Sequence, residues 1–440
     1  MVSIDLDSKL MASKMRNEFL YKQFVKAGYL LPPAEKIFDK LRLVNFRRSA
    51  CVDRSLLFPS EFIYGLDSKG HDVIPITVEV LIAATTLYVP NETEHALNVA
   101  KRMGYNASCS FQRAAIGLES QNKLPKFKAA FISNVPCDYS ADTFNQIFSK
   151  RKIPVYNFIL PSEYNINTKK FMKSQFEQFA KRIYEDSKGD IRMDIDKLRE
   201  AIKYSNDSRK NFLDGINHMK GPGRLIKGTE FVNYNLFCSG GFGSKEFVTI
   251  SKKFSKELGE RRKYLETNKV NKSEKPRICL IHFPPYSYLD FLKNIDSQGD
   301  IVAAEINSIW WDEIPYDDPF EGLAIKMGAK SGVGWSLKSR SEVIHRHILE
   351  EFNIDGVIYI QHMFGTSCPL ASEGCVSRLK NEIDIVNKKF NKDMLVEVVP
   401  IDCICSTSVP ANVDTRIDSF FETLRLRKGQ PPFWLERFEN

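Results

Sequence analysis

Three features that would each reveal a function at once are missing from the chain. Its nine cysteines include no C-x-x-C pair, no apolar run reaches the ~18 residues needed to span a bilayer, and no dense basic block is interleaved with aromatic residues. These absences argue against a local cysteine metal motif, a membrane protein and a nucleic-acid-binding protein. The formal net charge of +8 is spread over 440 residues, as on a generally lysine-rich surface.

A secretory signal is also missing from the N-terminal residues, MVSIDLDSKLMASKMRNEFL, which are polar and charged and contain no apolar core. We therefore expect a cytoplasmic location, in which the cysteines are thiols or metal ligands rather than disulfides. The glycine-rich pieces GPGR and SGGFGS do not follow a strand in a dinucleotide-binding or P-loop arrangement, so the sequence favours ordinary loops there.

Apolar runs and helical patterns alternate along most of the chain. The runs FKAAFISNV and IPVYNFILP come first, and RICLIHFPP, GDIVAAEIN, DGVIYIQHM and LVEVVPID follow later, each separated from the next by amphipathic helical stretches. This alternation predicts an α/β protein with two doubly wound (Rossmann- or flavodoxin-like) parallel-sheet domains. We expect a helical N-terminal segment over 1–72, a first α/β domain over 73–235, and a second over 236–440 that ends in a helix.

Three cysteines stand at predicted element boundaries. Cys109 opens a small-residue helical pattern, whereas Cys137 and Cys368 each follow an apolar strand-like run. The ends of parallel strands converge at one edge of a sheet, so these three thiols can surround a single metal centre. Cys375 is a rival to Cys368, while Cys279 lies within a predicted strand and is expected only to pack. For Cys403 and Cys405, in IDCICSTS, packing and a place near a metal both remain open.

The segments around these cysteines resemble the 2-hydroxyacyl-CoA dehydratase and benzoyl-CoA reductase family of iron–sulfur enzymes. CSFQRAAIGLE is similar to the first cluster-cysteine segment of that family and NVPCDYSADTF to its second. DPFEGLAIK and the long segment RSEVIHRHILEEFNIDGVIYIQHM are similar to the elements that lead to the third cysteine. MDIDKLREAI and the closing VDTRIDSFFETL are further similar segments, so the resemblance runs from about residue 73 to 425.

What the resemblance implies is a [4Fe–4S] cluster held by Cys109, Cys137 and Cys368, with the fourth iron open. It also implies an acyl-CoA substrate, an ATP-dependent iron–sulfur activator protein that injects one electron, and radical elimination of water by an oxygen-sensitive enzyme. Family members pair with a homologous second subunit, as heterodimers or homodimers. Aromatic acyl-CoA reduction, and an electron-transfer or scaffold role beside a catalytic partner, are the alternatives within the family. A metal-free α/β binding protein is the alternative outside it.

Glu79 is the residue that the resemblance suggests for acid–base catalysis. It lies in TVEVLIAAT and matches a glutamate of the family, although Thr77 stands where the family usually has proline. A glutamate at the start of a helix is also favoured by the helix dipole alone, so a structural role stays open. The loop between Tyr359 and Cys368 is longer than in many dehydratase subunits and resembles that of the reductase type.

Overall fold

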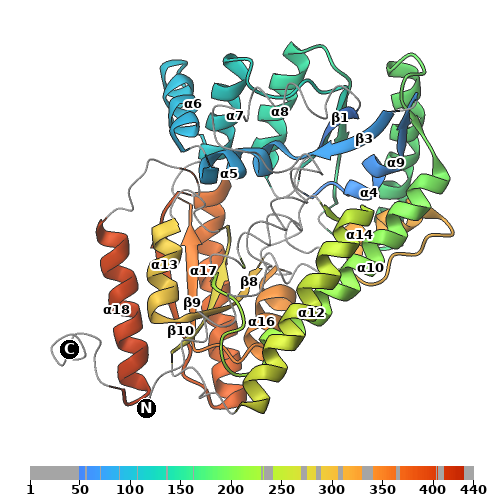
Figure 1. The fold of residues 1–440 in the computed structure, drawn as a ribbon. Coiled ribbons are helices and arrows are strands. Elements are labelled where there is room, and N and C mark those ends of the chain that lie inside the picture. The colour runs from blue at the N-terminus through green and yellow to red at the C-terminus, as the bar shows by residue number, and fades with distance from the viewer. Residues whose placement is uncertain are drawn as a thin grey trace.

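The structure is a computed structural model of the chain that describes residues 49–430 with short gaps. The gaps are 55–56, 70, 89, 107, 135–136, 162, 229–230, 232–240, 269–274, 284–288, 306–310, 330–339, 363–366, 403 and 405–410. Within the described residues the strands form two separate sheets, one of six strands and one of four (Figure 1).

The first sheet has the strand order β5-β4-β1-β3-β2-β6. Its strands are β1 (Ser49–Arg54), β2 (Leu66–Ser68), β3 (His71–Ile76), β4 (Ala129–Ser133), β5 (Val155–Phe158) and β6 (Arg192–Met193). Four of them, β5, β4, β1 and β3, are parallel to one another. At one side of the sheet β2 pairs antiparallel with β3, and the edge strand β6 pairs antiparallel with β2. Every residue of β4, AAFIS, is buried, as expected where helices cover both faces of a parallel sheet.

Helices cover both faces of this first sheet (Figure 1). They are α4 (Ser60–Tyr64), α5 (Val78–Tyr88), α6 (Pro90–Arg102), α7 (Ser110–Ser120), α8 (Asp138–Lys150), α9 (Ile166–Asp186) and α10 (Ile195–Met219). One hydrophobic cluster fills the layer between the sheet and α5 to α8. On the other face, α4, α9 and α10 bury stacked rings, among them Phe58 on Phe131 with centroids 5.1 Å apart. The two long helices begin with side-chain caps, Asn165 for α9 and Asp194 for α10.

The second sheet is parallel throughout, with the order β10-β9-β7-β8. Its strands are β7 (Arg277–Ile281), β8 (Asp300–Ala304), β9 (Gly356–Gln361) and β10 (Leu395–Pro400). The helices of this domain are α13 (Leu289–Gln298), α14 (Pro319–Ala329), η4 (Arg340–His345), α16 (Arg346–Glu351), α17 (Ser367–Phe390) and α18 (Ala411–Arg427). From β7 the chain adds β8 on one side of the sheet, and from β9 it adds β10 on the other side. The topological switch point therefore lies between β7 and β9, where ligands usually bind in such sheets.

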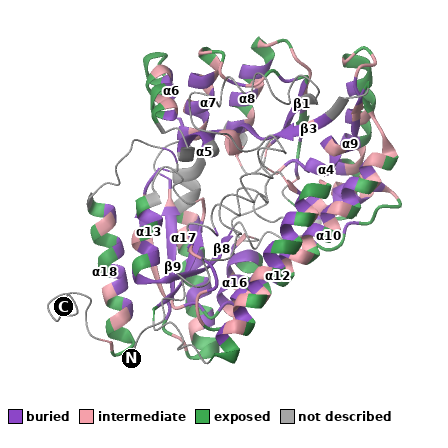
Figure 2. Cartoon of the chain, viewed as in Figure 1, coloured by how far each residue is buried: buried purple, intermediate pink, exposed green. Residues whose placement is uncertain are grey.

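The long helix α12 (Lys245–Thr267) packs along α10, and together they form the diagonal pair on one side of the molecule (Figure 1). Their inner faces are buried and their outer faces are exposed (Figure 2). Arg277, at the start of β7, joins this pair to the second sheet. Its guanidinium donates to the carbonyl oxygens of Met219, the last residue of α10, and Gly221. It also donates to those of Phe352 and Asn353 beyond α16, all at 3.0–3.1 Å.

The two doubly wound parallel-sheet domains predicted from the sequence are confirmed. The predicted helical segment over 1–72 differs in its described part, because residues 49–72 provide β1, α4, β2 and the start of β3 to the first sheet. The short run SACVDR is too polar to resemble a central strand, although β1 lies between β3 and β4. Residues 1–48 lie outside the described residues, and the domain boundaries at 72 and 235 stay predictions.

Within the described part of the chain, no helix combines the length and apolar character that crossing a membrane requires. The glycine-rich pieces GPGR and SGGFGS follow the sequence expectation as far as they are described. The first forms a turn after α10, and the end of the second supplies Ser244, whose side chain caps α12.

Candidate functional site

The carboxyl edges of the two sheets face each other, and the candidate site lies between them. In the first domain α5 follows β3 and α8 follows β4, while α7 runs back to the start of β4, so all three helices begin at the carboxyl edge. In the second domain α17 begins after β9 at the corresponding edge. Asp402, two residues after β10, accepts a hydrogen bond from Ser110 of α7 at 2.5 Å, which joins the two edges directly.

Cys109 and Cys137 occupy equivalent places on neighbouring helices. Cys109 is the N-cap residue of α7 and Cys137 is the N-cap residue of α8, and these two helices pack on each other. Cys109 is buried, Cys137 is half-buried, and both are thiols rather than disulfides. The first turn of a helix presents backbone N–H groups and a partial positive charge, so both sulfur atoms lie where a negative charge is favoured.

Glu79 is held close to the Cys137 turn. It lies in the first turn of α5, and its Oε1 accepts a hydrogen bond from Ser140 Oγ at 3.3 Å. Ser140 is in the first turn of α8, where its backbone N–H donates to the carbonyl oxygen of Cys137 at 3.1 Å. The structure thus brings together two residues that the sequence analysis singled out for different reasons.

Cys368 lies in the first turn of α17, and only its backbone is among the described residues; its side chain is not. Cys403 and Cys405 lie outside the described residues as well. The rival residue, Cys375, is described. It is buried in α17 with its sulfur 3.9 Å from Arg340 Nη1, and burial raises the pKa of its thiol.

The donor set at this edge fits an iron–sulfur cluster as far as it is described. Cysteine thiolates are the usual protein ligands of such clusters, and two of the three predicted ligands begin adjacent helices at one sheet edge. The third begins α17 at the edge of the other sheet. Among the described side chains, which do not include that of Cys368, no group of three or more His, Cys, Asp or Glu residues is placed to hold a metal ion.

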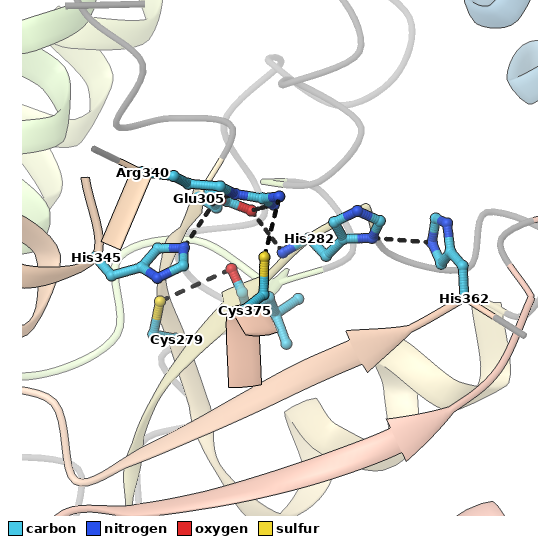
Figure 3. Close-up of polar contacts among 8 residues, drawn as sticks. Cys279, His282, Glu305, Arg340, His345, His362 and Cys375 are labelled. Carbon is cyan, nitrogen blue, oxygen red and sulfur yellow. Dashed lines mark hydrogen bonds and ion pairs between the residues drawn. The ribbon is translucent and has the colours of Figure 1, made fainter. Parts of the chain in front are cut away.

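A buried charged network occupies the carboxyl edge of the second sheet (Figure 3). Glu305, directly after β8, is its centre. One carboxylate oxygen accepts from Arg340 Nε and from His345 Nε2, the latter at 2.9 Å. The other accepts from Arg340 Nη2 at 2.5 Å and from the backbone N–H of His282 at 2.8 Å. Glu305 therefore receives four hydrogen bonds and a bidentate arginine ion pair.

The charges of this network compensate one another. Burial alone raises the pKa of the Glu305 carboxyl, but the charge of Arg340 and the hydrogen bonds from Arg340 and His345 hold it well below its usual range. Burial lowers the pKa of Arg340, and the carboxylate of Glu305 outweighs that effect and raises it. The network thus contains the ionised, buried carboxylate of Glu305 and the ionised guanidinium of Arg340, whose side chain is 11% exposed.

Two histidines meet at the switch point of the second sheet. His282 follows β7 and His362 follows β9, and the His282 Nδ1 and His362 Nε2 atoms are 3.3 Å apart (Figure 3). His362 Nε2 is also 3.2 Å from the carbonyl oxygen of Phe283. A carbonyl oxygen only accepts, so His362 Nε2 carries the hydrogen and His282 Nδ1 accepts. Burial is the main cause that lowers the pKa of both rings, although the charge of Asp402 raises that of His362 in part.

This chain matches the family model of the 2-hydroxyglutaryl-CoA dehydratase D-component over residues 56–424. The chain belongs to this family. A search of curated proteins finds no match to it. The dehydratase part of the resemblance seen in the sequence is thereby confirmed, while the reductase branch and the iron–sulfur cluster stay predictions.

Sequence analysis did not identify the charged network that this member of the dehydratase family carries in its second domain. The signal was present, because His282, Glu305 and His362 each follow or nearly follow a strand, just as Cys137 follows β4. The convergence of strand ends at one sheet edge applies to these polar residues as it does to cysteines. Arg340 does not follow a strand, so the sequence gives no such signal for it. It lies at the start of η4, and its contact with Glu305 depends on how that helix packs in the folded chain.

Proposed function

We propose that this chain is the [4Fe–4S]-bearing subunit of a 2-hydroxyacyl-CoA dehydratase, with Cys109, Cys137 and Cys368 as the ligands. The observation that carries the proposal is the pair of cysteine N-caps on α7 and α8 at the carboxyl edge of the first sheet. The family match supports a dehydratase component, and the description of the family as a D-component supports the existence of a second component that works with this chain. We infer that this partner is a homologous subunit and that a separate ATP-dependent activator protein supplies the electron.

When bound, the cluster would supply one electron and a Lewis-acidic iron for an oxygen of the acyl-CoA. The chain itself has three tasks. It holds the three thiolates at helix N-termini, where negative charge is favoured. It encloses the site between two domains, which keeps water away from a reactive intermediate. It also moves a proton, and Glu79 is the residue we assign to that task.

Dehydration of a 2-hydroxyacyl-CoA removes hydroxide from carbon 2 and a proton from carbon 3, and the two leave as one water. A carboxylate beside the substrate can take up the proton and return it to the departing hydroxide. Glu79 fits this role because it is half-buried and its Oε1 is oriented by Ser140, one helical turn after Cys137. The proton therefore moves at the Glu79 carboxyl, close to the helix that carries a proposed ligand.

The loop that leads to Cys368 supports a second candidate. Its length between Tyr359 and Cys368 resembles the reductase branch, for which the substrate would be an aromatic acyl-CoA. An electron-relay role beside a catalytic partner also uses the same three cysteines. Turnover of the complete enzyme, assembled from this chain, its partner and the activator, distinguishes these candidates when 2-hydroxyacyl-CoA and aromatic acyl-CoA substrates are compared.

The test of the cluster is iron binding by the anaerobically purified chain. We expect about four irons per chain and absorbance near ~400 nm, and loss of both in separate Cys109→Ala, Cys137→Ala and Cys368→Ala variants. Cys375→Ala is the matched control, because Cys375 is a buried cysteine of the same helix as Cys368 and contacts Arg340. Full iron content in Cys109→Ala, or its loss in Cys375→Ala alone, contradicts the ligand assignment.

A further inference from the structure

The segment after β10 crosses from the second domain to the first. Asp402 is buried, with 4% of its surface exposed, and its Oδ1 accepts a hydrogen bond from Ser110 Oγ at 2.5 Å. Its Oδ2 lies 3.5 Å from Arg113 Nη2. Ser110 and Arg113 are one turn apart on α7, 292 and 289 residues away from Asp402 along the chain. A single carboxylate of the second domain therefore contacts the first turn of α7 twice.

An apolar contact accompanies these polar ones. Ile404, two residues further on, is completely buried and belongs to the hydrophobic cluster between the first sheet and helices α5 to α8. That cluster also contains Ala114 and Ala115 of α7. The 402–404 segment thus places an anion at the start of α7 and a hydrophobic side chain within the core beside it.

The place of this contact matters because of what begins α7. Cys109 is the N-cap residue but makes no capping hydrogen bond with its own side chain, and its carbonyl oxygen accepts the first helical bond, from the Arg113 N–H, at 2.9 Å. Ser110, the next residue, is completely buried and donates to Asp402. The carboxylate therefore complements the positive end of the helix from the other domain. By holding Ser110, it fixes the backbone position of Cys109.

We propose that Asp402 is a positioning residue that fixes the Cys109 end of helix α7 against the second domain, and that its negative charge lowers the reduction potential of the group held by Cys109. The first consequence depends only on the contacts of the described residues. The second rests on the proposed function, since it requires a cluster at Cys109. A negative charge near a redox centre disfavours the gain of an electron, and the positive charge of Arg113, 3.5 Å from Asp402 Oδ2, acts in the opposite direction.

The positioning role is tested on the metal-free chain by amide hydrogen exchange. We expect the amides of residues 113–115 to exchange about tenfold faster in Asp402→Asn and in Ser110→Ala. Ser110→Ala removes the hydroxyl that donates to Asp402, and Asp402→Asn replaces one of the two acceptor oxygens by an NH2 group, so that Ser110 and Arg113 no longer each have their own acceptor. Glu382→Gln is the matched control. Glu382 is also buried and paired with an arginine, Arg346, but it lies about 21 Å along α17 from Cys368. Unchanged exchange in both Asp402→Asn and Ser110→Ala overturns the positioning role.

The charge effect is tested on the iron-loaded chain by redox titration followed with electron paramagnetic resonance. Asp402→Asn should raise the midpoint potential, whereas Ser110→Ala, which keeps the carboxylate, should shift it less, and Glu382→Gln should leave it unchanged. An iron-loaded Asp402→Asn chain with the wild-type potential overturns the charge effect. If the wild-type chain binds no iron, the proposed function and the charge effect fail together, while hydrogen exchange still decides the positioning role.

Discussion

The carboxyl edges of the two sheets occupy equivalent places in similar architectures and are built from different residues. The first edge carries Cys109, Cys137 and Glu79, each at the start of a helix. The second carries the ion pair of Glu305 and Arg340 together with buried histidines. At the first edge, helix N-termini favour ligands that bring negative charge. At the second, the charges are already compensated within the protein.

This difference assigns separate tasks to the two domains. A buried, fully hydrogen-bonded ion pair fixes the relative positions of the elements that contribute to it, here β7, β8 and η4. Cysteines at helix N-termini are suited to binding a ligand that brings negative charge. We therefore expect substitutions at the second edge to change stability, and substitutions at the first edge to change ligand binding. Four predictions test this division, from the largest expected effect to the smallest.

Cys137→Ser should abolish iron binding without unfolding the chain. Serine keeps the size of the side chain but is a poor cluster ligand, so iron content should fall at least about tenfold. Because Cys137 is only half-buried, the free energy of unfolding of the metal-free chain should change by less than about 1 kcal/mol. Iron analysis and urea denaturation measure the two effects. A large loss of stability with iron retained reverses the division of tasks.

Glu305→Gln should give the opposite pattern. The substitution leaves the Arg340 guanidinium, whose side chain is only 11% exposed, without its carboxylate partner, which costs about 3–5 kcal/mol of unfolding free energy. Urea denaturation of the metal-free chain measures this cost, and Glu342→Gln, an exposed glutamate of the same η4 turn as Arg340, is the control. A cost below about 1 kcal/mol in Glu305→Gln contradicts a stabilising network.

The histidine pair should make stability depend on pH. Burial lowers the pKa of both His282 and His362 below the value near 6.5 that they have in the unfolded chain. The unfolded state thus binds more protons than the folded state. The contribution of these histidines to the free energy of unfolding is therefore fully present above pH ~6.5 and is lost as the pH falls below that value. The loss is at most about 1.4 kcal/mol per pH unit for each histidine. In denaturation experiments between pH ~5 and ~8, the unfolding free energy of His282→Gln should change less with pH than that of the wild type. The exposed His347→Gln should keep the wild-type slope.

Ser140→Ala should have the smallest effect on stability. It removes the hydroxyl that donates to Glu79 Oε1 and costs about 0.5–1.5 kcal/mol of unfolding free energy. Turnover by the assembled enzyme should fall less than in Glu79→Gln, for which loss of a general acid–base group predicts a decrease of about 10²-fold or more. Equal turnover in Glu79→Gln and the wild type removes Glu79 from the proposed mechanism.

Much of the fold could be predicted from local pattern, and the misses have physical causes. The strands β4, β7 and β8 can be recognised in the sequence as continuous apolar runs, because helices bury both faces of these strands. β1 was missed because SACVDR mixes polar and apolar residues, and its place in the sheet is set by pairing with strands on both sides.

The candidate site divides in the same way. Cys109 and Cys137 could be predicted because each lies at the end of an element that the sequence reveals. The contact of Asp402 with Ser110 could not, since the two residues are 292 positions apart and their meeting depends on how the domains pack. The ion pair of Glu305 with Arg340 likewise depends on the fold of the intervening chain.

Arg277 has a consequence for dividing the protein into fragments. Its guanidinium, at the start of the second sheet, is bonded to the carbonyl oxygens of Met219 and Gly221, which precede the predicted domain boundary at 235. Expressed alone, residues 236–440 would retain this buried arginine and lose those acceptors. The two halves should therefore be poorly soluble apart and should recover structure when co-expressed, which makes the chain a candidate for a split protein that reassembles along α10 and α12.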